Sequence, residues 1–215
     1  MTTDKHFNPE DYDFSSDSKK TISVDGNKII RFFFKQAIAD PISTRKVSMS
    51  DGKREWLDGC KTILDVGAGC GATVKALLDE HKIAMGVTVN PKEIIIAKKE
   101  FNVELELADM HDLPYGDNSF DGLIMWDVLE HSVSPFIALS EARRVLKKDG
   151  KILIYMPDEE DWTECIYHYS VMSETQMNFM FRRLGFAVHS VKEGIYEAQR
   201  VENFNQVDFD KAHFK

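Results

Sequence analysis

The chain has 215 residues, 43 % of them hydrophobic and 11 % aromatic, enough to form a domain with its own core and no structural disulfides. Its 27 basic and 36 acidic side chains give a net charge of −9, which disfavours binding to the phosphate backbone of a nucleic acid. The 3 cysteines form no CxxC pair, and no window is apolar enough for a signal sequence or a membrane span. We therefore expect a cytoplasmic protein that binds neither nucleic acid nor membranes.

The amino-terminal quarter of the chain differs in composition from the rest. Residues 1–18 are acidic and rich in Asp and Ser, which is typical of an arm outside a folded core. Residues 28–40 are densely apolar and include three consecutive phenylalanines that begin at Phe32. These side chains could form a lid over a pocket, but packing in a core explains them better. These features predict an amino-terminal arm and helical cap over residues 1–55 and a separate domain over residues 56–215.

From residue 60 onwards, short apolar runs alternate with segments of helical periodicity, the pattern of strand–helix–strand units and a parallel sheet. The expected strands are 62–66, 83–88, 103–108, 120–126 and 151–156, and the expected helices are 72–80, 91–100 and 135–147. A helix from 173 to 184 and two strands, 186–192 and 196–202, complete the pattern with an antiparallel hairpin. We predict an α/β fold with a seven-stranded, mostly parallel sheet, a terminal antiparallel hairpin, and helices on both faces.

Capping residues mark several of these helix ends. In Asn90-Pro91-Lys92-Glu93 we expect an N-cap, a proline at the first helical position and a capping-box glutamate. Gly150 is expected to follow the end of the third helix as its C′ residue. Ser173 predicts a capped start for the fourth helix, and Gly185 predicts its end.

A glycine-rich segment, Asp65-Val66-Gly67-Ala68-Gly69-Cys70-Gly71, joins the first strand to the first helix. Glycines at such a turn let the chain bend tightly and let a ligand approach the backbone, at the edge where open α/β sheets bind ligands. Because Ala72 can stand in for a third glycine, the dinucleotide-binding pattern GxGxxA also fits. A tight turn without a ligand is the simplest alternative, and the turn alone does not select a cofactor.

Further motifs make the chain resemble the class I S-adenosylmethionine-dependent methyltransferases, in particular the type 11 group. The resemblance covers about Trp56 to Val201 and is carried by ILDVGAGCG, GVTVNP, ADMHDLPYGDNSFD, the LEH triplet after the fourth strand, and EARRVLKKDGKILI. It implies a Rossmann-like fold, S-adenosylmethionine as cofactor and a methyltransferase domain over residues 56–215.

The resemblance also implies roles for individual residues. The glycines of the turn would face the methionine part of the cofactor, and Asp65 would hold its amino group. Asp109 would accept a hydrogen bond from the adenine amine, and Met110 would pack on the purine. The cofactor-binding residues predicted in this way are Asp65, Gly67, Ala68, Gly69, Gly71, Thr88, Val89, Asp109, Met110, Trp126 and Val128.

One position departs from the common pattern of these enzymes. Most relatives end the second strand with an acidic residue that binds the ribose hydroxyls, whereas this chain has Thr88 there. A neutral hydroxyl still binds a ribose, although charge-assisted hydrogen bonds are about twice as strong. The same substitution disfavours NAD, whose ribose usually binds an acidic residue at this position.

The acceptor side is less clearly marked, because methyl transfer depends mainly on alignment and needs a base only when the nucleophile must lose a proton. We predict that His131 and Glu130 are the catalytic residues, with His131 as general base; in the simpler interpretation they only shape the cofactor pocket. Asp127-x-x-Glu130-His131 also resembles a metal-binding ExxEH element of some methyltransferases, with His168 as a further ligand. Whether these four residues bind a metal stays open, and no metal ligand is assigned.

Other polar residues have plainer explanations. The acidic run Asp158–Asp161 is typical of a solvated loop, although it and neighbours such as Trp162 could recognise a cationic acceptor. His111 and the remaining histidines show no pairing in the sequence and are expected at the surface. An NPPY element is absent after the fourth strand, which disfavours methylation of adenine N6.

The leading hypothesis is therefore a methyltransferase that acts on a small-molecule acceptor through an oxygen, nitrogen or carbon nucleophile. Two alternatives remain open on the sequence. One is an NAD(P)-type oxidoreductase on a similar sheet, which Asp109 and the terminal hairpin disfavour. The other is a cofactor-binding subunit without catalysis of its own. The oligomeric state is not predicted.

Overall fold

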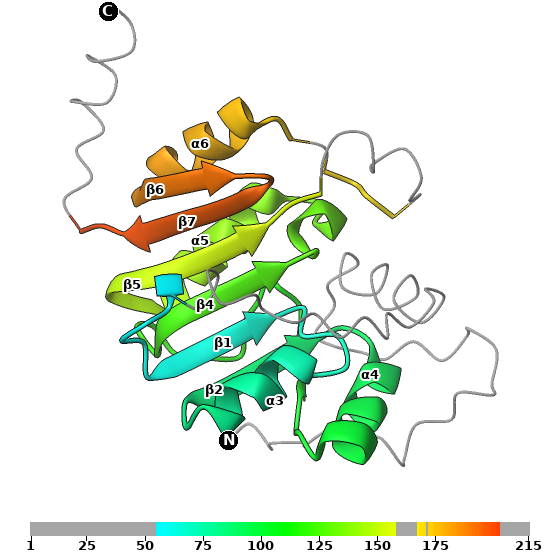
Figure 1. Ribbon diagram of the computed structural model, residues 1–215. Helices are drawn as coiled ribbons and strands as arrows, with labels where there is room; N and C mark the ends of the chain where they lie inside the picture. The colour runs from blue at the N-terminus through cyan, green and yellow to red at the C-terminus, as the bar shows by residue number, and fades with distance from the viewer. Residues whose placement is uncertain (1–54, 158–166, 171, 203–215) are drawn as a thin grey trace, which may run out of the picture.

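A computed structural model of the chain describes residues 55–157, 167–170 and 172–202. Seven strands form one sheet in the order β3-β2-β1-β4-β5-β7-β6 (Figure 1). The strands are β1 Thr62–Val66, β2 Ile83–Thr88, β3 Glu106–Leu107, β4 Phe120–Trp126, β5 Leu146–Tyr155, β6 Phe186–Lys192 and β7 Ile195–Arg200. The helices are α3 Ala72–Asp79, α4 Pro91–Ile96, α5 Pro135–Val145 and α6 Glu174–Arg183, with a π-helix η2 at Ala97–Phe101 and a 3₁₀ helix η3 at Leu129–His131.

Strand direction confirms the predicted fold. β1, β2, β3, β4 and β5 are parallel, while β7 pairs antiparallel with both β5 and β6. The carboxyl ends of the parallel strands therefore meet at one edge of the sheet, where ligand sites of open α/β sheets form. The predicted arm and cap over residues 1–55 lie outside the described residues except for Glu55, so that division of the chain stays a prediction.

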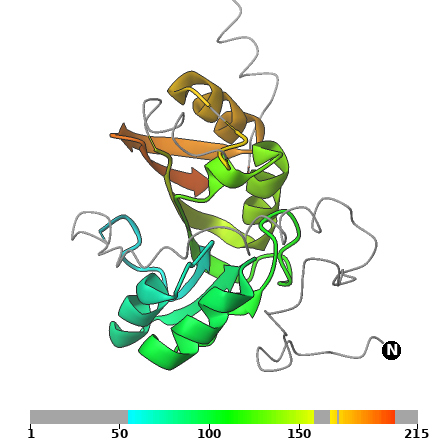
Figure 2. The same cartoon turned by 90° about the vertical axis from the view of Figure 1, so that its right-hand side faces the viewer.

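Two helical layers cover the sheet, with α3 and α4 on one face and α5 and α6 on the other (Figure 2). Because successive side chains of a strand point to opposite faces of the sheet, neighbouring residues pack against different helical layers. Leu64 packs with the α5 and α6 side chains, while Ile63 packs with Leu77 of α3. Both faces of the central strands are thus buried, as expected for a parallel sheet between helices. Among the described residues, no helix combines the length and the apolar character that crossing a bilayer requires.

The segment around Gly150 differs from its prediction. α5 ends at Val145 and β5 begins at the next residue, so Gly150 lies inside a strand and does not end a helix. The pairing with β4 jumps from Leu146 to Lys151, which leaves residues 147–150 as a bulge. A Cβ at Gly150 would lie 2.8 Å from the Lys147 carbonyl oxygen, so the bulge itself requires glycine.

Two other boundaries differ as well. β3 has only two residues instead of the predicted six, because its residues pair only with Val87 and Thr88 at the edge of the sheet. The predicted helix over 91–100 ends as an α-helix at Ile96 and continues as the π-helix η2. In contrast, the capped start predicted at Ser173 is confirmed, and there Ser173 and Gln176 form a capping box at the start of α6.

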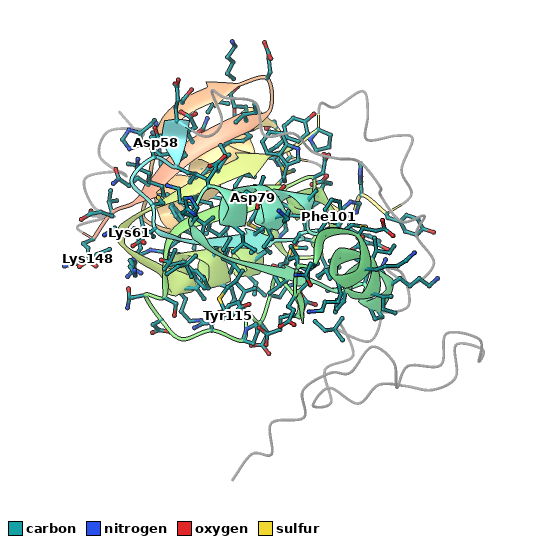
Figure 3. The ribbon with its side chains drawn as sticks, turned by 60° about the horizontal axis from the view of Figure 1, so that its bottom comes forward. Asp58, Lys61, Asp79, Phe101, Tyr115 and Lys148 are labelled. Carbon is teal, nitrogen blue, oxygen red and sulfur yellow. The ribbon has the colours of Figure 1, made fainter. Side chains whose placement is uncertain are left out.

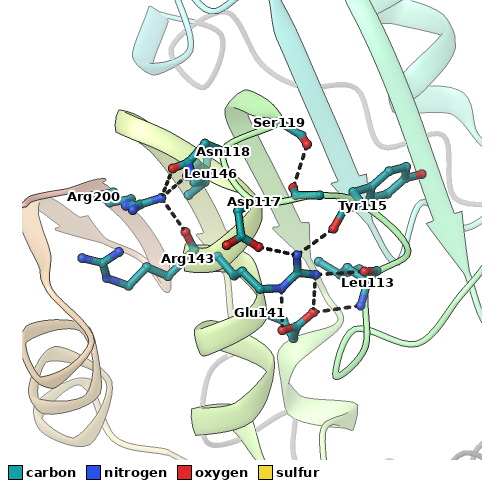
Figure 4. A network of polar contacts seen from close by, with 11 residues as sticks. Leu113, Tyr115, Asp117, Asn118, Ser119, Glu141, Arg143, Leu146 and Arg200 are labelled. Carbon is teal, nitrogen blue, oxygen red and sulfur yellow. Dashed lines mark hydrogen bonds and ion pairs between the residues drawn. The ribbon is translucent and has the colours of Figure 1, made fainter.

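Arg144 of α5 fixes the loop that follows β3 (Figure 4). Its guanidinium donates to the carbonyl oxygens of Leu113 (2.9 Å) and Tyr115 (2.6 Å) and forms ion pairs with Glu141 (2.7 Å) and Asp117 (3.0 Å). Glu141 in turn accepts the Leu113 backbone N–H at 3.0 Å. A loop without regular secondary structure is thereby attached to a helix.

Candidate functional site

The glycine turn follows β1 directly at the carboxyl edge of the sheet. The backbone N–H groups of Gly67 and Ala68 donate to the Val87 carbonyl oxygen at 3.0 and 2.9 Å, which holds the turn against the end of β2. Gly69 has a φ of +51°, and a Cβ built there would meet no atom within 4 Å. The turn therefore combines a left-handed backbone with open space beside it, as close approach of a ligand requires.

Gly67 is constrained on its other side by Val128, which follows β4. A side chain at Gly67, whose φ is +74°, would collide with the Val128 side chain. The structure thus brings the first-strand turn and the fourth-strand end into contact. Trp126, the last residue of β4, stacks on Tyr155 of β5 with ring centroids 4.7 Å apart.

Asp65 occupies the penultimate position of β1, with Gly86 and Ile124 as its neighbours on the adjacent strands. It is 3 % exposed, and burial raises the pKa of its carboxyl to about 7. A cationic group beside this carboxyl would favour its ionised form and would itself be stabilised. Asp65 therefore suits an ammonium ligand such as the amino group of a methionine moiety.

Thr88, at the end of β2, has an acidic neighbour that the sequence analysis did not assign to the site. Its hydroxyl donates to the Glu93 carboxylate at 2.5 Å and accepts the Asn90 backbone N–H at 3.1 Å. Asn90 caps α4 through Lys92, but Glu93 does not return to the Asn90 backbone, so the predicted capping box is wrong. The first turn of α4 thus places a carboxylate beside the threonine that replaces the usual acid.

Asp109 follows β3 and is anchored through one of its two oxygens. Oδ1 accepts the His111 backbone N–H at 2.8 Å and lies 2.6 Å from His111 Nδ1. Oδ2 is buried and has no hydrogen-bond partner among the described residues. An orphaned carboxylate oxygen is costly unless a ligand supplies a donor, so Asp109 fits an amine such as that of adenine.

His111 contradicts its predicted surface position. Its side chain is 12 % exposed, and its Nε2 lies 2.7 Å from the hydroxyl of Ser132, which is fully buried. Met110, beside it, is partly buried against the core cluster formed with α5 and α6. Sequence spacing could not reveal the His111 contact, because the two partners are 21 residues apart.

The predicted catalytic residues lie in η3, directly after β4. Glu130 is 1 % exposed, and its pKa is raised to about 8, first by burial and then by the nearby charge of Asp127. One ligand atom from each of Glu130, His131 and His168 lies within 4.8 Å of the others. The cluster does not include Asp127, whose backbone has a φ of 51°, so three of the four candidate metal ligands come together.

Backbone contacts hold His168 beside η3. His131 Nδ1 lies 3.0 Å from the Tyr167 carbonyl oxygen, which can only accept, so Nδ1 carries the proton and Nε2 holds the lone pair. The N–H groups of Tyr169 and Ser170 both donate to the Glu130 carbonyl oxygen, at 2.9 and 3.0 Å. The segment 158–162 and the three phenylalanines from Phe32 lie outside the described residues.

The opposite, amino-terminal edge of the sheet has a different character. A shallow depression there is lined by residues that include Asp58, Cys60, Asp121 and Lys148, and Figure 3 shows Asp58 and Lys148 on this side of the molecule. Asp121 already forms an ion pair with Lys147 at 2.8 Å. The charges of this depression are therefore largely satisfied within the chain, unlike the orphaned carboxylate oxygen of Asp109.

Comparisons with known proteins agree with this geometry. Residues 64–154 match the family model of a methyltransferase domain. The chain is 28 % identical over 154 residues to uncharacterized protein MJ1123 of Methanocaldococcus jannaschii, covering 65 % of this chain and 73 % of that one. It is 26 % identical over 148 residues to the O-methyltransferase cnsE of Penicillium expansum, covering 61 % of this chain but only 54 % of cnsE.

Among solved structures, a SAM-dependent methyltransferase from Archaeoglobus fulgidus shares the fold, with a TM-score of 0.56, 23 % identity, and coverage of 63 % of this chain and 66 % of that one. The match of residues 64–154 to a methyltransferase domain and the shared fold make this part of the chain similar to the class I S-adenosylmethionine-dependent methyltransferases. S-adenosylmethionine is the cofactor of this class, and the buried, partnerless oxygen of Asp109 fits its adenine amine.

Proposed function

We propose that this chain transfers a methyl group from S-adenosylmethionine to a small-molecule acceptor through an oxygen, nitrogen or carbon nucleophile. The observation that carries the proposal is the orphaned Oδ2 of Asp109 at the same sheet edge as the glycine turn. Ala108 donates its N–H to the Thr88 carbonyl oxygen at 3.0 Å, so Asp109 lies next to the end of β2. A purine amine and a ribose can thus be bound by neighbouring strand ends.

In this proposal each part of the cofactor has its own partners. Asp65 and the turn of Gly67, Ala68, Gly69 and Gly71 hold the methionine part, and Thr88 and Val89 lie beside the ribose. Asp109 and Met110 hold the adenine, while Trp126 and Val128 close the site from β4. To this set we add Glu93, because its contact with Thr88 supplies the carboxylate that β2 lacks.

The acceptor side is assigned to His131 and Glu130. The cofactor supplies an electrophilic methyl group when bound, so the chain must orient the acceptor and, for an oxygen or nitrogen acceptor, remove a proton. His131 Nε2 carries the lone pair that takes this proton, because Nδ1–H is donated to the Tyr167 carbonyl oxygen. Glu130 is the buried neighbour of that imidazole and supports its position.

The same cluster supports a second candidate for the acceptor side. Two imidazoles and one carboxylate within 4.8 Å are the donor set of many catalytic transition-metal sites, which leave coordination positions open for a substrate. A metal-ligating histidine usually donates its other ring N–H to a carbonyl or carboxylate, as His131 does. If a metal acts here, chelation stops turnover and Mn²⁺ or Zn²⁺ restores it; a base mechanism is unaffected by the chelator.

Calorimetry with S-adenosylmethionine, S-adenosylhomocysteine and NADH tests the proposal first. We expect micromolar binding of both sulfur ligands, about −8 kcal/mol, and none of NADH. Radiolabelled methyl transfer to a panel of hydroxylated, amine and activated-carbon acceptors then tests catalysis. Tight NADH binding without a response to either sulfur ligand would contradict the proposal, and cofactor binding without transfer to any acceptor would favour the non-catalytic alternative.

A further inference from the structure

A buried row of hydrogen bonds connects the loop after β3 with the end of η3. It runs from Asp109 Oδ1 to His111 Nδ1 at 2.6 Å and from His111 Nε2 to the Ser132 hydroxyl at 2.7 Å. Ser132 Oγ also accepts the Ser134 backbone N–H at 3.1 Å. The side chains of Asp109 and His111 are 5 % and 12 % exposed, so water competes little with these contacts.

Only one arrangement of protons satisfies the whole row when the imidazole is neutral. The Asp109 carboxylate can only accept, so His111 Nδ1 carries the proton and Nε2 holds a lone pair. The Ser132 hydroxyl then donates to Nε2 while it accepts from Ser134. Hydrogen bonds that all point in one direction polarise and strengthen one another.

This row acts differently on the two oxygens of Asp109. Oδ1 receives two donors from the same residue, the backbone N–H and the ring Nδ1–H of His111. Oδ2 receives none among the described residues. The carboxylate is therefore held in one orientation, with a single acceptor atom left for a ligand.

We infer that His111 is a positioning residue that sets the preference of the site for a 6-aminopurine. A ligand that presents an N–H donor to Oδ2 completes the hydrogen bonding of Asp109. A purine without a 6-substituent presents no donor at this position and leaves Oδ2 orphaned. This inference rests on the proposed function, in which Asp109 binds the adenine of the cofactor.

The experiment compares S-adenosylhomocysteine with its 6-deamino analogue, in which hydrogen replaces the purine 6-amino group, and measures both dissociation constants by calorimetry. For the unaltered chain we expect at least a tenfold preference for the 6-amino ligand, consistent with a hydrogen bond to a charged group. His111→Leu should reduce this ratio by at least fivefold, because the Asp109 carboxylate can then rotate and form hydrogen bonds with other donors. The ratio is the decisive quantity, since a general loss of stability weakens both ligands equally.

Two matched variants separate positioning from packing. The amide of His111→Asn lies near the former Nδ1 and can still donate to Asp109, so the preference should be largely retained. The amide of His111→Gln extends toward the former Nε2, so the contact with Asp109 and the preference should both be lost. This pair keeps a polar side chain in each case and decides the question even if His111→Leu fails to fold.

The outcomes distinguish the inference from the proposal beneath it. If Asp109→Ala retains the unaltered preference, the purine does not bind at Asp109 and the proposed cofactor site fails. If Asp109→Ala abolishes the preference while His111→Gln keeps it as fully as His111→Asn does, the cofactor site stands and the role of His111 is overturned.

Discussion

The two sides of the proposed site are built by different means. On the cofactor side, the glycine turn is shaped by the backbone itself, through positive φ angles and hydrogen bonds from Gly67 and Ala68 to the end of β2. On the acceptor side, side chains of Glu130, His131 and His168 meet because residues 167–170 return from β5 to bond with η3. A binding site formed by the backbone suits a cofactor that relatives share, because it does not depend on particular side chains. A binding site formed by side chains suits an acceptor that differs among relatives.

The strongest test of the backbone-built side is Gly69→Val. A branched side chain at a φ of +51° is strained and occupies the open space beside the turn, so we expect binding of S-adenosylhomocysteine to fall below detection in calorimetry. Gly59→Val is the matched control, because Gly59 also has a left-handed φ (+83°) and open space around it, but lies at the opposite edge of the sheet. Equal loss of binding in both variants would assign the effect to folding.

The corresponding test of the side-chain-built side is His131→Gln. Removal of a general base should slow transfer to an oxygen or nitrogen acceptor by about 10²- to 10⁴-fold, with cofactor affinity nearly unchanged. His189→Gln, a substitution in β6 at an exposed position, should leave the rate as it was. Loss of cofactor binding in His131→Gln would instead show that η3 is a wall of the cofactor pocket.

Asp65 gives the cofactor side a pH dependence. The pKa of its carboxyl is about 7 in the folded chain, against an ordinary value of 3.8. Below pH 7 the carboxyl therefore holds a proton, and it must lose this proton before it can pair with the ammonium group of the ligand. Affinity for S-adenosylhomocysteine should therefore rise about tenfold per pH unit from pH 5.5 towards 7 and then level off. By the same linkage, the folded chain without ligand binds more protons than the unfolded one, so its stability should decrease as pH rises from about 4 to 7.

Two substitutions serve as comparisons for this profile. Asp65→Asn should weaken binding and flatten the pH dependence, whereas Asp58→Asn, at the amino-terminal edge, should preserve both the affinity and the slope (Figure 3). A slope that survives in Asp65→Asn would show that another group titrates with the ligand.

The smallest expected effect concerns the ribose. Thr88→Val removes one neutral hydrogen bond and should cost about 0.5–1.5 kcal/mol of binding, while Glu93→Gln removes a charged acceptor and should cost about 1.5–3 kcal/mol. Calorimetry with S-adenosylhomocysteine measures both. If neither variant changes the affinity, the ribose contact belongs to Asn90 or to the backbone.

Much of the framework could be predicted from periodicity and turn residues. The bounds of β1, β2, β4 and β6 were predicted as the structure has them, because each is a largely apolar segment between clear turn signals. β3 was overextended because Val103 and Leu105 are buried like strand residues, yet they pack under α4 and η2 without joining the ladder. Gly150 was misassigned because a glycine required by a bulge and one that ends a helix look alike in a sequence.

The site was harder to predict where it depends on distant contacts. The turn from Asp65 to Gly71 has a local signal, and so does Asp109 at the end of a strand. The pairing of Glu93 with Thr88 was hidden by its suitability as a capping residue, and the contact of His111 with Ser132 exists only once β3 and β4 lie at the same edge of the sheet. Local sequence patterns therefore predicted where a ligand would bind, while the fold determined which side chains surround that position.

The attachment of the loop after β3 to α5 has a consequence for how the molecule opens. Because Glu141 accepts the Leu113 N–H while Arg144 binds the carbonyl oxygens of Leu113 and Tyr115, the Leu113 amide should resist hydrogen exchange as those of α5 do, although it belongs to no helical or strand ladder (Figure 4). Release of this loop then requires loss of its contacts with Glu141 and Arg144 of α5.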